Sequence, residues 1–191
     1  MLTESPPRSA PLLAQFRASD EMCDLEVPPD DRLRAAAEAI KAAMSGGTTA
    51  EVRDACARFL RAAADFYGVP EPGVRVLAAR PLRVREGGWA TELFGDYAPD
   101  KMLIRVWMRT AVRQKVTSLG TFLSTLCHEF CHHLDGRGLG FRDSPHTRGF
   151  YARTAVLYHH ARGTPLKRLV WARMRGGRWR IDWPATNRGE L

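Results

Sequence analysis

The sequence predicts an α+β protein, with N-terminal helices, a small, mainly antiparallel sheet, a motif-bearing helix and a following helix. Ala-rich runs with helical start and stop signals occupy residues 32–68, and short β-rich runs broken by Pro, Gly and Asp occupy residues 74–108. An amphipathic helical pattern resumes at residue 119. The 191 residues fit one domain with appended segments, and a hydrophobic fraction of 45% is ordinary for a folded protein.

The N-terminal part divides into an arm and two helices. Residues 1–28 are rich in Pro, Ser and acidic side chains without a sustained period, so we expect a flexible N-terminal arm. A first helix is predicted over residues 32–44. A second helix is predicted to begin after a capping box formed by Thr48 and Glu51 and to end at Gly68. The short connection between them suggests an antiparallel helical hairpin.

The β-rich runs are predicted as strands over residues 74–80, 89–97 and 102–108. A turn at residues 98–101, which contains Pro and Asp, joins the second strand to the third. Because this sheet immediately precedes the motif-bearing helix, one of its edges is expected to flank the site and could accept an extended peptide.

The helix predicted over residues 117–135 carries the motif HExxH at His128, Glu129 and His132. Residues four apart on a helix lie about 6 Å apart along the axis and about 40° apart around it, so both imidazoles reach one point. Two such histidines are typical of a zinc site, and the adjacent Glu can act as general base. One apolar stripe supports this helix: Leu119, Phe122, Leu123, Leu126, Phe130 and Leu134.

A third protein ligand is needed, and several candidates can be excluded. Asp135 and Gly138 stand where the metzincin extension has Gly and His, so that class does not apply. The only Glu downstream of the motif is Glu190. His133 points about 100° away from His132, toward the apolar stripe, and is expected to pack or to be hydrogen-bonded there.

His146 is the remaining histidine candidate. We predict a helix over residues 145–162 with Ser144 as its N-cap, which places His146 in the first turn. His159 and His160 would lie roughly 20 Å further along this helix. Asp135 and Asp143 are weaker oxygen candidates.

The pattern of an HExxH helix after a short hairpin, then a loop, then His146 with Phe150 four positions on, resembles the SprT-like family of zinc metallopeptidases. The resemblance covers roughly residues 60–160. It implies a zincin-like fold over residues 29–162 and hydrolysis of peptide bonds in a protein or peptide substrate by a zinc-activated water. It also implies Glu129 as the catalytic general base and three ligands for Zn²⁺: His128, His132 and His146. The chain departs from the family at Thr147, where Gly is frequent, and it has no Cys-rich zinc ribbon.

Charge is concentrated in the C-terminal part of the chain. The net charge is +8, and residues 162–191 hold eight Lys and Arg against two acidic residues. Residues 163–191 are predicted to form a basic hairpin segment that turns at Gly176-Gly177 and interleaves Trp with Arg. This composition fits nucleic-acid binding, with single strands the easier target. It fits equally a hairpin that packs its Trp face on the domain, and an acidic protein would serve the same charge.

Two function classes are compatible with these patterns. The first is a zinc-dependent endopeptidase. The alternative is a nucleic-acid- or protein-binding module with a structural zinc site and no peptidase activity. Glu129 favours the enzyme, because a structural site has no use for a base beside its ligand. Hydrolysis of a non-peptide amide is a third hypothesis.

Composition also bears on location and on cysteine chemistry. No stretch approaches the roughly 18 apolar residues of a spanning helix, and the N-terminus lacks a signal-peptide pattern, so we expect a cytoplasmic protein that does not bind a membrane. The four cysteines form no CxxC pair, so neither a disulfide framework nor a zinc ribbon is indicated. Cys127 and Cys131 are expected to be small buried side chains, and a role as thiolate ligand is the alternative.

Overall fold

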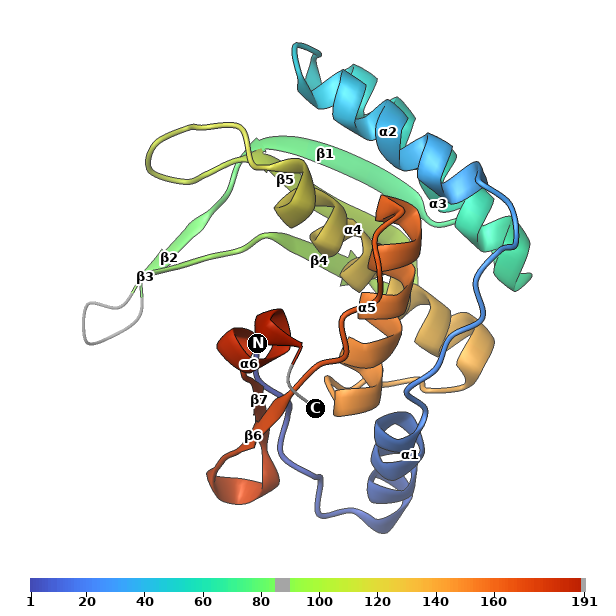
Figure 1. Ribbon diagram of the computed structural model, residues 1–191, viewed down its shortest axis with the longest axis vertical. Helices are drawn as coiled ribbons and strands as arrows, with labels where there is room; N and C mark the ends of the chain where they lie inside the picture. Colours follow the sequence, from blue (N-terminus) through green and yellow to red (C-terminus); the bar gives the residue numbers. More distant parts are fainter. Residues whose placement is uncertain (85–89, 190–191) are drawn as a thin grey trace.

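The computed structural model of the chain describes residues 1–84 and 90–189, and Figure 1 shows how their helices and strands are arranged. Within these residues the protein is α+β, with a small mixed sheet, as the sequence predicted at that coarse level. No helix in these two ranges is long and apolar enough to cross a membrane. The elements are α1 (Ala10–Glu21), α2 (Arg32–Met44), α3 (Thr49–Tyr67), β1 (Gly73–Ala79), β2 (Leu82–Val84), β3 (Ala90–Glu92), β4 (Gly95–Ala98), β5 (Leu103–Arg109), α4 (Leu119–Leu134), α5 (Arg148–Arg162), β6 (Trp171–Arg173), β7 (Trp179–Ile181) and α6 (Trp183–Arg188).

The two predicted N-terminal helices are α2 and α3, which pack against each other beside β1 (Figure 1). The capping box of α3 forms as predicted: the Thr48 side chain accepts from the Glu51 backbone N–H, and the Glu51 carboxylate accepts from the Thr48 N–H. Gly68 ends α3 in the left-handed conformation, with φ of 63°, which a glycine adopts without strain.

The main sheet has the strand order β1-β5-β4 and is mixed, so the prediction of a mainly antiparallel sheet is wrong for its longest pairing. β1 runs parallel to β5, and β4 runs antiparallel to β5. Parallel pairing is accessible because the chain between β1 and β5 is a long excursion through β2, β3 and β4 rather than a tight turn. Strand-forming composition gives no information about direction, which is why the sequence did not reveal it.

The second predicted strand, residues 89–97, divides into β3 and β4 in the structure, and its first residue, Trp89, lies outside the described ranges. β3 pairs with β2 as a separate antiparallel ribbon, whereas β4 joins the main sheet. The predicted turn at residues 98–101 joins β4 to β5 through a short 3₁₀ turn.

Helix α4, which carries the HExxH motif, begins after Ser118, whose hydroxyl accepts from the Thr121 N–H at 3.2 Å. It lies against β4, β5 and α5. Its predicted apolar stripe is buried in the core, apart from Leu119, which is half-buried. Cys127 and Cys131 are buried free thiols on the same helix, as expected of small core side chains.

Helix α5 begins later than predicted. Its N-cap is Thr147, whose Oγ1 accepts from the Phe150 N–H at 3.0 Å, so the prediction of a helix from residue 145 capped by Ser144 is wrong. The Ser144 side chain is instead bonded to His132 and Asp135, and its φ of 38° is not that of an N-cap. His146 therefore lies in the connection before α5 and not in its first turn.

Residues 1–28 contain the helix α1, which the prediction of a flexible arm missed. α1 lies beside the start of α5, where a Cβ at Gly149 would stand 2.0 Å from the Ser19 carbonyl oxygen. Upstream of α1, Leu2 forms an antiparallel bridge with Arg180, and the Thr3 N–H donates to the Trp179 carbonyl at 2.8 Å. The sequence of this segment has only weak periodicity, and its contacts are made with distant parts of the chain. For that reason the sequence did not predict them.

The predicted C-terminal hairpin is present as β6 and β7, joined through Gly176 and Gly177, which both have φ of 71°. Trp171 packs 6.0 Å from the ring of Tyr151, and the Arg148 guanidinium lies 4.8 Å from the centroid of Trp179. Both indoles therefore pack against side chains of α5. Three arginines of the hairpin remain exposed: Arg173, Arg175 and Arg180.

Replacing Gly149 with Ala should disturb the contact between α1 and α5, because no space exists for the added methyl group. We expect the free energy of unfolding to fall by about 1–3 kcal/mol, despite the better helix propensity of Ala. Urea titration measures this change. Gly46→Ala is the control, since a Cβ there meets nothing within 4 Å, and equal stability of the two variants would contradict the close contact.

Candidate metal centre

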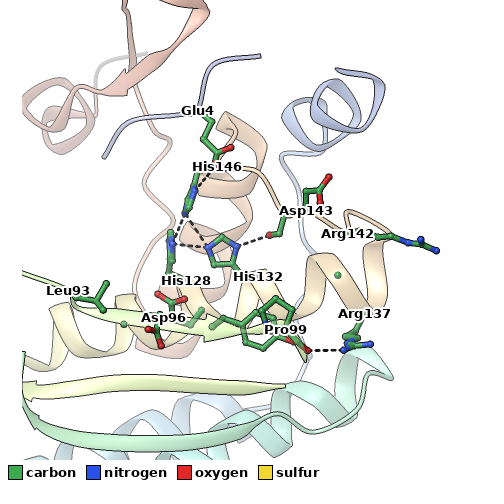
Figure 2. A pocket seen from close by; sticks show the side chains of 15 residues that line it. Glu4, Leu93, Asp96, Pro99, His128, His132, Arg137, Arg142, Asp143 and His146 are labelled. Atoms are coloured by element: carbon green, nitrogen blue, oxygen red, sulfur yellow. Dashed lines mark hydrogen bonds and ion pairs between the residues drawn. The ribbon is translucent and has the colours of Figure 1, made fainter. Parts of the chain in front are cut away.

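Three histidine side chains converge at one point in the structure, as Figure 2 shows. The Nε2 atoms of His128 and His132, on α4, are 3.2 Å apart, and each lies 3.1–3.2 Å from Nε2 of His146. Three nitrogens at 2.0–2.1 Å from a tetrahedral zinc would be separated by about 3.3 Å. This triangle therefore fits a metal ion bound by three imidazoles, and these residues could hold one.

Phe150, in the first turn of α5, packs against all three imidazoles. Its ring centroid lies 4.9 Å from that of His128, 4.5 Å from that of His132 and 5.2 Å from that of His146. The phenyl side chain itself is fully buried. It therefore forms an apolar backing that restricts the orientation of each ring.

Hydrogen bonds at the other ring nitrogens fix the tautomer of two histidines. Nδ1 of His146 lies 2.8 Å from the Glu4 carboxylate, which as an acceptor requires the proton on Nδ1. Nδ1 of His132 lies 2.7 Å from Oγ of Ser144, which donates its own proton to Asp135 at 3.0 Å. Both Nδ1 atoms are then donors, and both Nε2 atoms present lone pairs to the centre. This arrangement is typical of metal-binding histidines.

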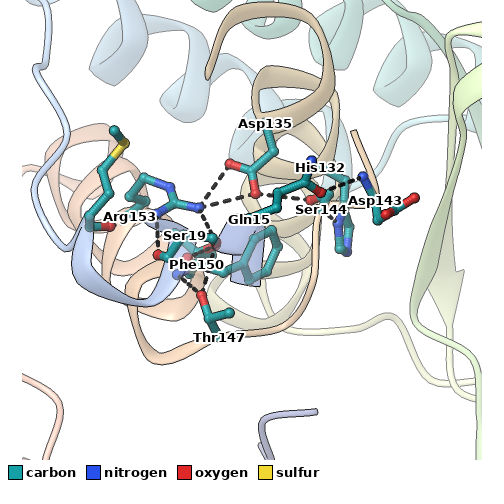
Figure 3. A network of polar contacts seen from close by, with 11 residues as sticks. Gln15, Ser19, His132, Asp135, Asp143, Ser144, Thr147, Phe150 and Arg153 are labelled. Atoms are coloured by element: carbon teal, nitrogen blue, oxygen red, sulfur yellow. Dashed lines mark hydrogen bonds and ion pairs between the residues drawn. The ribbon is translucent and has the colours of Figure 1, made fainter. Parts of the chain in front are cut away.

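A buried ion pair supports this chain of bonds (Figure 3). Nη2 of Arg153 lies 3.0 Å from both carboxylate oxygens of Asp135, and neither side chain is more than 1% exposed. Asp135 is therefore an outer support for His132, and not one of the three convergent groups. Asp143, the other oxygen candidate, lines the adjacent cavity without joining them.

Burial keeps two of the three clustered imidazoles neutral. It lowers the pKa of His128 to about 3, with the neighbouring His146 adding to the effect. It lowers the pKa of His132 to about 2, with His128 and His146 adding to it. Neutral imidazole is the form that binds a metal, so these two side chains offer lone pairs with little competition from protons.

Glu129 lies beside the three histidines and is only 6% exposed. Burial, and secondarily the charge of Asp96, raises the pKa of its carboxyl group to about 8. Gly95 on β4 lies over this side chain: a Cβ there would stand 3.1 Å from Oε1 of Glu129 and 2.5 Å from the Thr125 methyl group. The sequence analysis did not identify Gly95. A glycine within a strand indicates that another group approaches the backbone closely, but it does not indicate which group.

Two cavities meet at this centre. The first, of about 890 Å³, has charged residues in its lining, among them Arg137, Arg142 and Asp143. The second, of about 800 Å³, lies between α4, α5 and the C-terminal segment and has a more apolar lining. Four residues line both cavities: Leu93, Gly95, His128 and Glu129. The centre is thus accessible from two sides.

The structure also locates His133, which the sequence analysis excluded as a metal ligand, and two polar side chains near the centre. His133 is buried, donates from Nε2 to the Pro70 carbonyl at 2.7 Å and accepts from the Tyr97 hydroxyl at 2.8 Å, as expected of a structural histidine. Tyr151 donates to the Leu2 carbonyl at 3.1 Å, and Arg148 pairs with Asp20. Both side chains therefore bond to the N-terminal segment of the chain.

Comparisons of the chain with protein-family models, with curated proteins and with solved structures gave no match. Fold and site alone define it as an α+β protein with a three-histidine group able to hold a metal ion. Its function must therefore be inferred from the chemistry of that group and its surroundings.

Metal binding should depend on His146 and not on the histidines of α5. We expect one zinc per chain in the wild type, and loss of high-affinity binding in His146→Ala, because two imidazoles leave the site incomplete. Isothermal titration with zinc and metal analysis after dialysis measure this. His159→Ala is the matched control, since His159 bonds to Thr164 and lies outside the group. Full zinc affinity in His146→Ala would contradict the assignment.

Proposed function

We propose that this chain is a zinc-dependent metallopeptidase of the SprT-like type, with a zincin-like domain. The observation that carries the proposal is the triangle of three Nε2 atoms beside the buried carboxyl group of Glu129, at the meeting point of two cavities. Structural zinc sites usually have four protein ligands, whereas the described residues bring three His, Cys, Asp or Glu side chains together here. Three ligands with access to a cavity are typical of a catalytic site.

The donor set suits zinc. Neutral imidazole binds zinc, copper, iron and nickel, and the four-residue spacing of His128 and His132 on one helix is typical of zinc peptidases. When bound, zinc would supply a Lewis acid that polarises a carbonyl group and lowers the pKa of a water molecule.

Glu129 has the position and chemistry of a general base. Its carboxylate would accept a proton from the attacking water and deliver that proton to the leaving amine. The raised pKa of this carboxyl group makes it a stronger base when it is ionised, and the charge of a bound metal ion would favour that ionised form. Gly95 allows β4 to approach closely enough to limit the movement of this side chain.

A peptide is the substrate that the surroundings favour. β4 is an edge strand of the described main sheet and borders the cavities through Gly95. An extended peptide could add to such an edge through backbone hydrogen bonds, and the cavities on either side of Glu129 would take its flanking side chains. These features support a peptide over a compact small amide.

Glu129→Gln should separate chemistry from metal binding. We expect casein cleavage to fall by about 10²–10⁴-fold, because the amide cannot accept the proton. Zinc content should remain one per chain, since Glu129 is not among the three convergent residues. Glu71→Gln, at an exposed ion pair with Arg61, is the control for loss of a carboxylate. Cleavage that survives in Glu129→Gln would exclude Glu129 as the general base, whereas a zinc-loaded wild type that cleaves no protein would favour the binding-module alternative.

We further propose that the hairpin formed by β6 and β7 recruits an anionic partner through its exposed arginines. Two of its tryptophans are packed on the domain, which supports contacts with phosphates over stacking on bases.

Replacing Arg173 and Arg175 with Ala should then weaken binding to single-stranded DNA. The dependence of log K on log salt should become less steep by about one to two, because fewer counterions are released. Fluorescence anisotropy across a salt series measures both. A double replacement of Arg53 and Arg58 on α3 is the control, and equal binding by the two double variants would exclude this role for the hairpin.

A further inference from the structure

The N-terminal segment, residues 1–22, bonds directly to His146 and is linked to His132 indirectly, through other side chains. We propose that this segment positions the metal ligands, with Glu4 as the positioning residue of His146. The inference rests on the proposed binding of a metal by the three histidines, and it does not depend on peptidase activity. It assigns a role to a part of the chain that the sequence alone presents as an unstructured arm.

The first route runs through Glu4, which holds both the ring and the main chain of His146. Nδ1 of His146 donates to Oε1 of Glu4 at 2.8 Å, and the His146 backbone N–H donates to the same oxygen at 3.2 Å. The Glu4 backbone N–H donates back to the His146 carbonyl at 2.9 Å. The Glu4 side chain is 55% exposed, so the charge itself contributes little. Its effect must come from fixing the ring orientation and the tautomer.

Glu4 is itself held in place by the C-terminal hairpin. The Thr3 N–H donates to the Trp179 carbonyl at 2.8 Å, and the Trp179 N–H donates to Oγ1 of Thr3 at 2.8 Å. Thr3 is only 3% exposed. On the other side, the Tyr151 hydroxyl donates to the Leu2 carbonyl at 3.1 Å. These contacts hold residues 1–3 beside β7 around the isolated antiparallel bridge of Leu2 with Arg180, and Glu4 follows at the end nearest the metal centre.

The second route runs through α1 and Arg153. The Arg153 guanidinium donates to the Ser19 carbonyl at 3.0 Å and to Oγ of Ser19 at 3.2 Å. The same group binds both oxygens of Asp135, which accepts from Ser144, the partner of His132 (Figure 3). The end of α1 therefore fixes the guanidinium that orients the support of the second ligand.

The test measures zinc affinity by competition with a chromophoric chelator, on the full chain. Outer partners of metal-bound histidines typically change metal affinity by 10–100-fold, so we expect Glu4→Ala to weaken zinc binding by about that factor. Glu4→Gln should retain most of the affinity, because the amide oxygen can still accept the bond from Nδ1. Glu21→Ala removes an exposed carboxylate from the same segment and should bind zinc like the wild type. Ser19→Ala tests the second route and should weaken zinc binding several-fold.

Two further readouts separate positioning from general stability. The visible spectrum of the cobalt-substituted protein should change in Glu4→Ala and not in Glu21→Ala, because the ligand field responds to the orientation of His146. The urea midpoint of metal-free Glu4→Ala should stay close to that of Glu21→Ala. Zinc affinities of Glu4→Ala and Ser19→Ala within twofold of the wild type would overturn this inference and leave the proposed function standing. A wild type that binds no zinc would overturn the proposed function as well.

Discussion

The buried ion pair between Asp135 and Arg153 holds the elements around the three histidines together. It joins the end of α4 to α5, and through the Ser19 carbonyl it joins both helices to α1. Removing one partner of a buried ion pair commonly costs about 3–5 kcal/mol, because the other charge is left without compensation. In this protein the cost would include the alignment of Ser144, and hence of His132. Fold stability and ligand geometry are therefore coupled through one pair of side chains.

In the same centre, burial shifts the pKa values of two kinds of side chain in opposite directions. Withdrawal from water keeps His128 and His132 neutral, which suits them to bind a cation. It also raises the pKa of Glu129, which makes its ionised form a stronger base, and a bound cation would favour that form. Phe150 and Gly95 provide this environment from α5 and β4 respectively. Neither residue carries a functional group of its own, and both act by controlling how closely other groups approach.

Local features were accessible from sequence because their causes are local. The capping box at Thr48 and the burial of the apolar stripe of α4 result from spacing within one or two helical turns. The convergence of His128 and His132 also results from helical geometry, and His146 was reached by exclusion. The predictions of strand direction and of the start of α5 were wrong for a different reason. The pairing of β1 with β5, and the capture of Ser144 by His132 and Asp135, depend on groups far away in the chain.

The amino-acid sequence was enough to define the chemistry available: an HExxH helix with an apolar back, a third histidine downstream, and a basic hairpin with Gly at its turn. The distant groups that complete the centre could be identified only from the tertiary structure. Glu4 is separated from His146 by 142 positions, and Gly95 meets Glu129 across the space between a strand and a helix. No periodicity links such pairs, because their proximity results from packing of the whole domain. The tertiary fold, and not any local conformational preference, brings the N-terminal segment to the metal ligands.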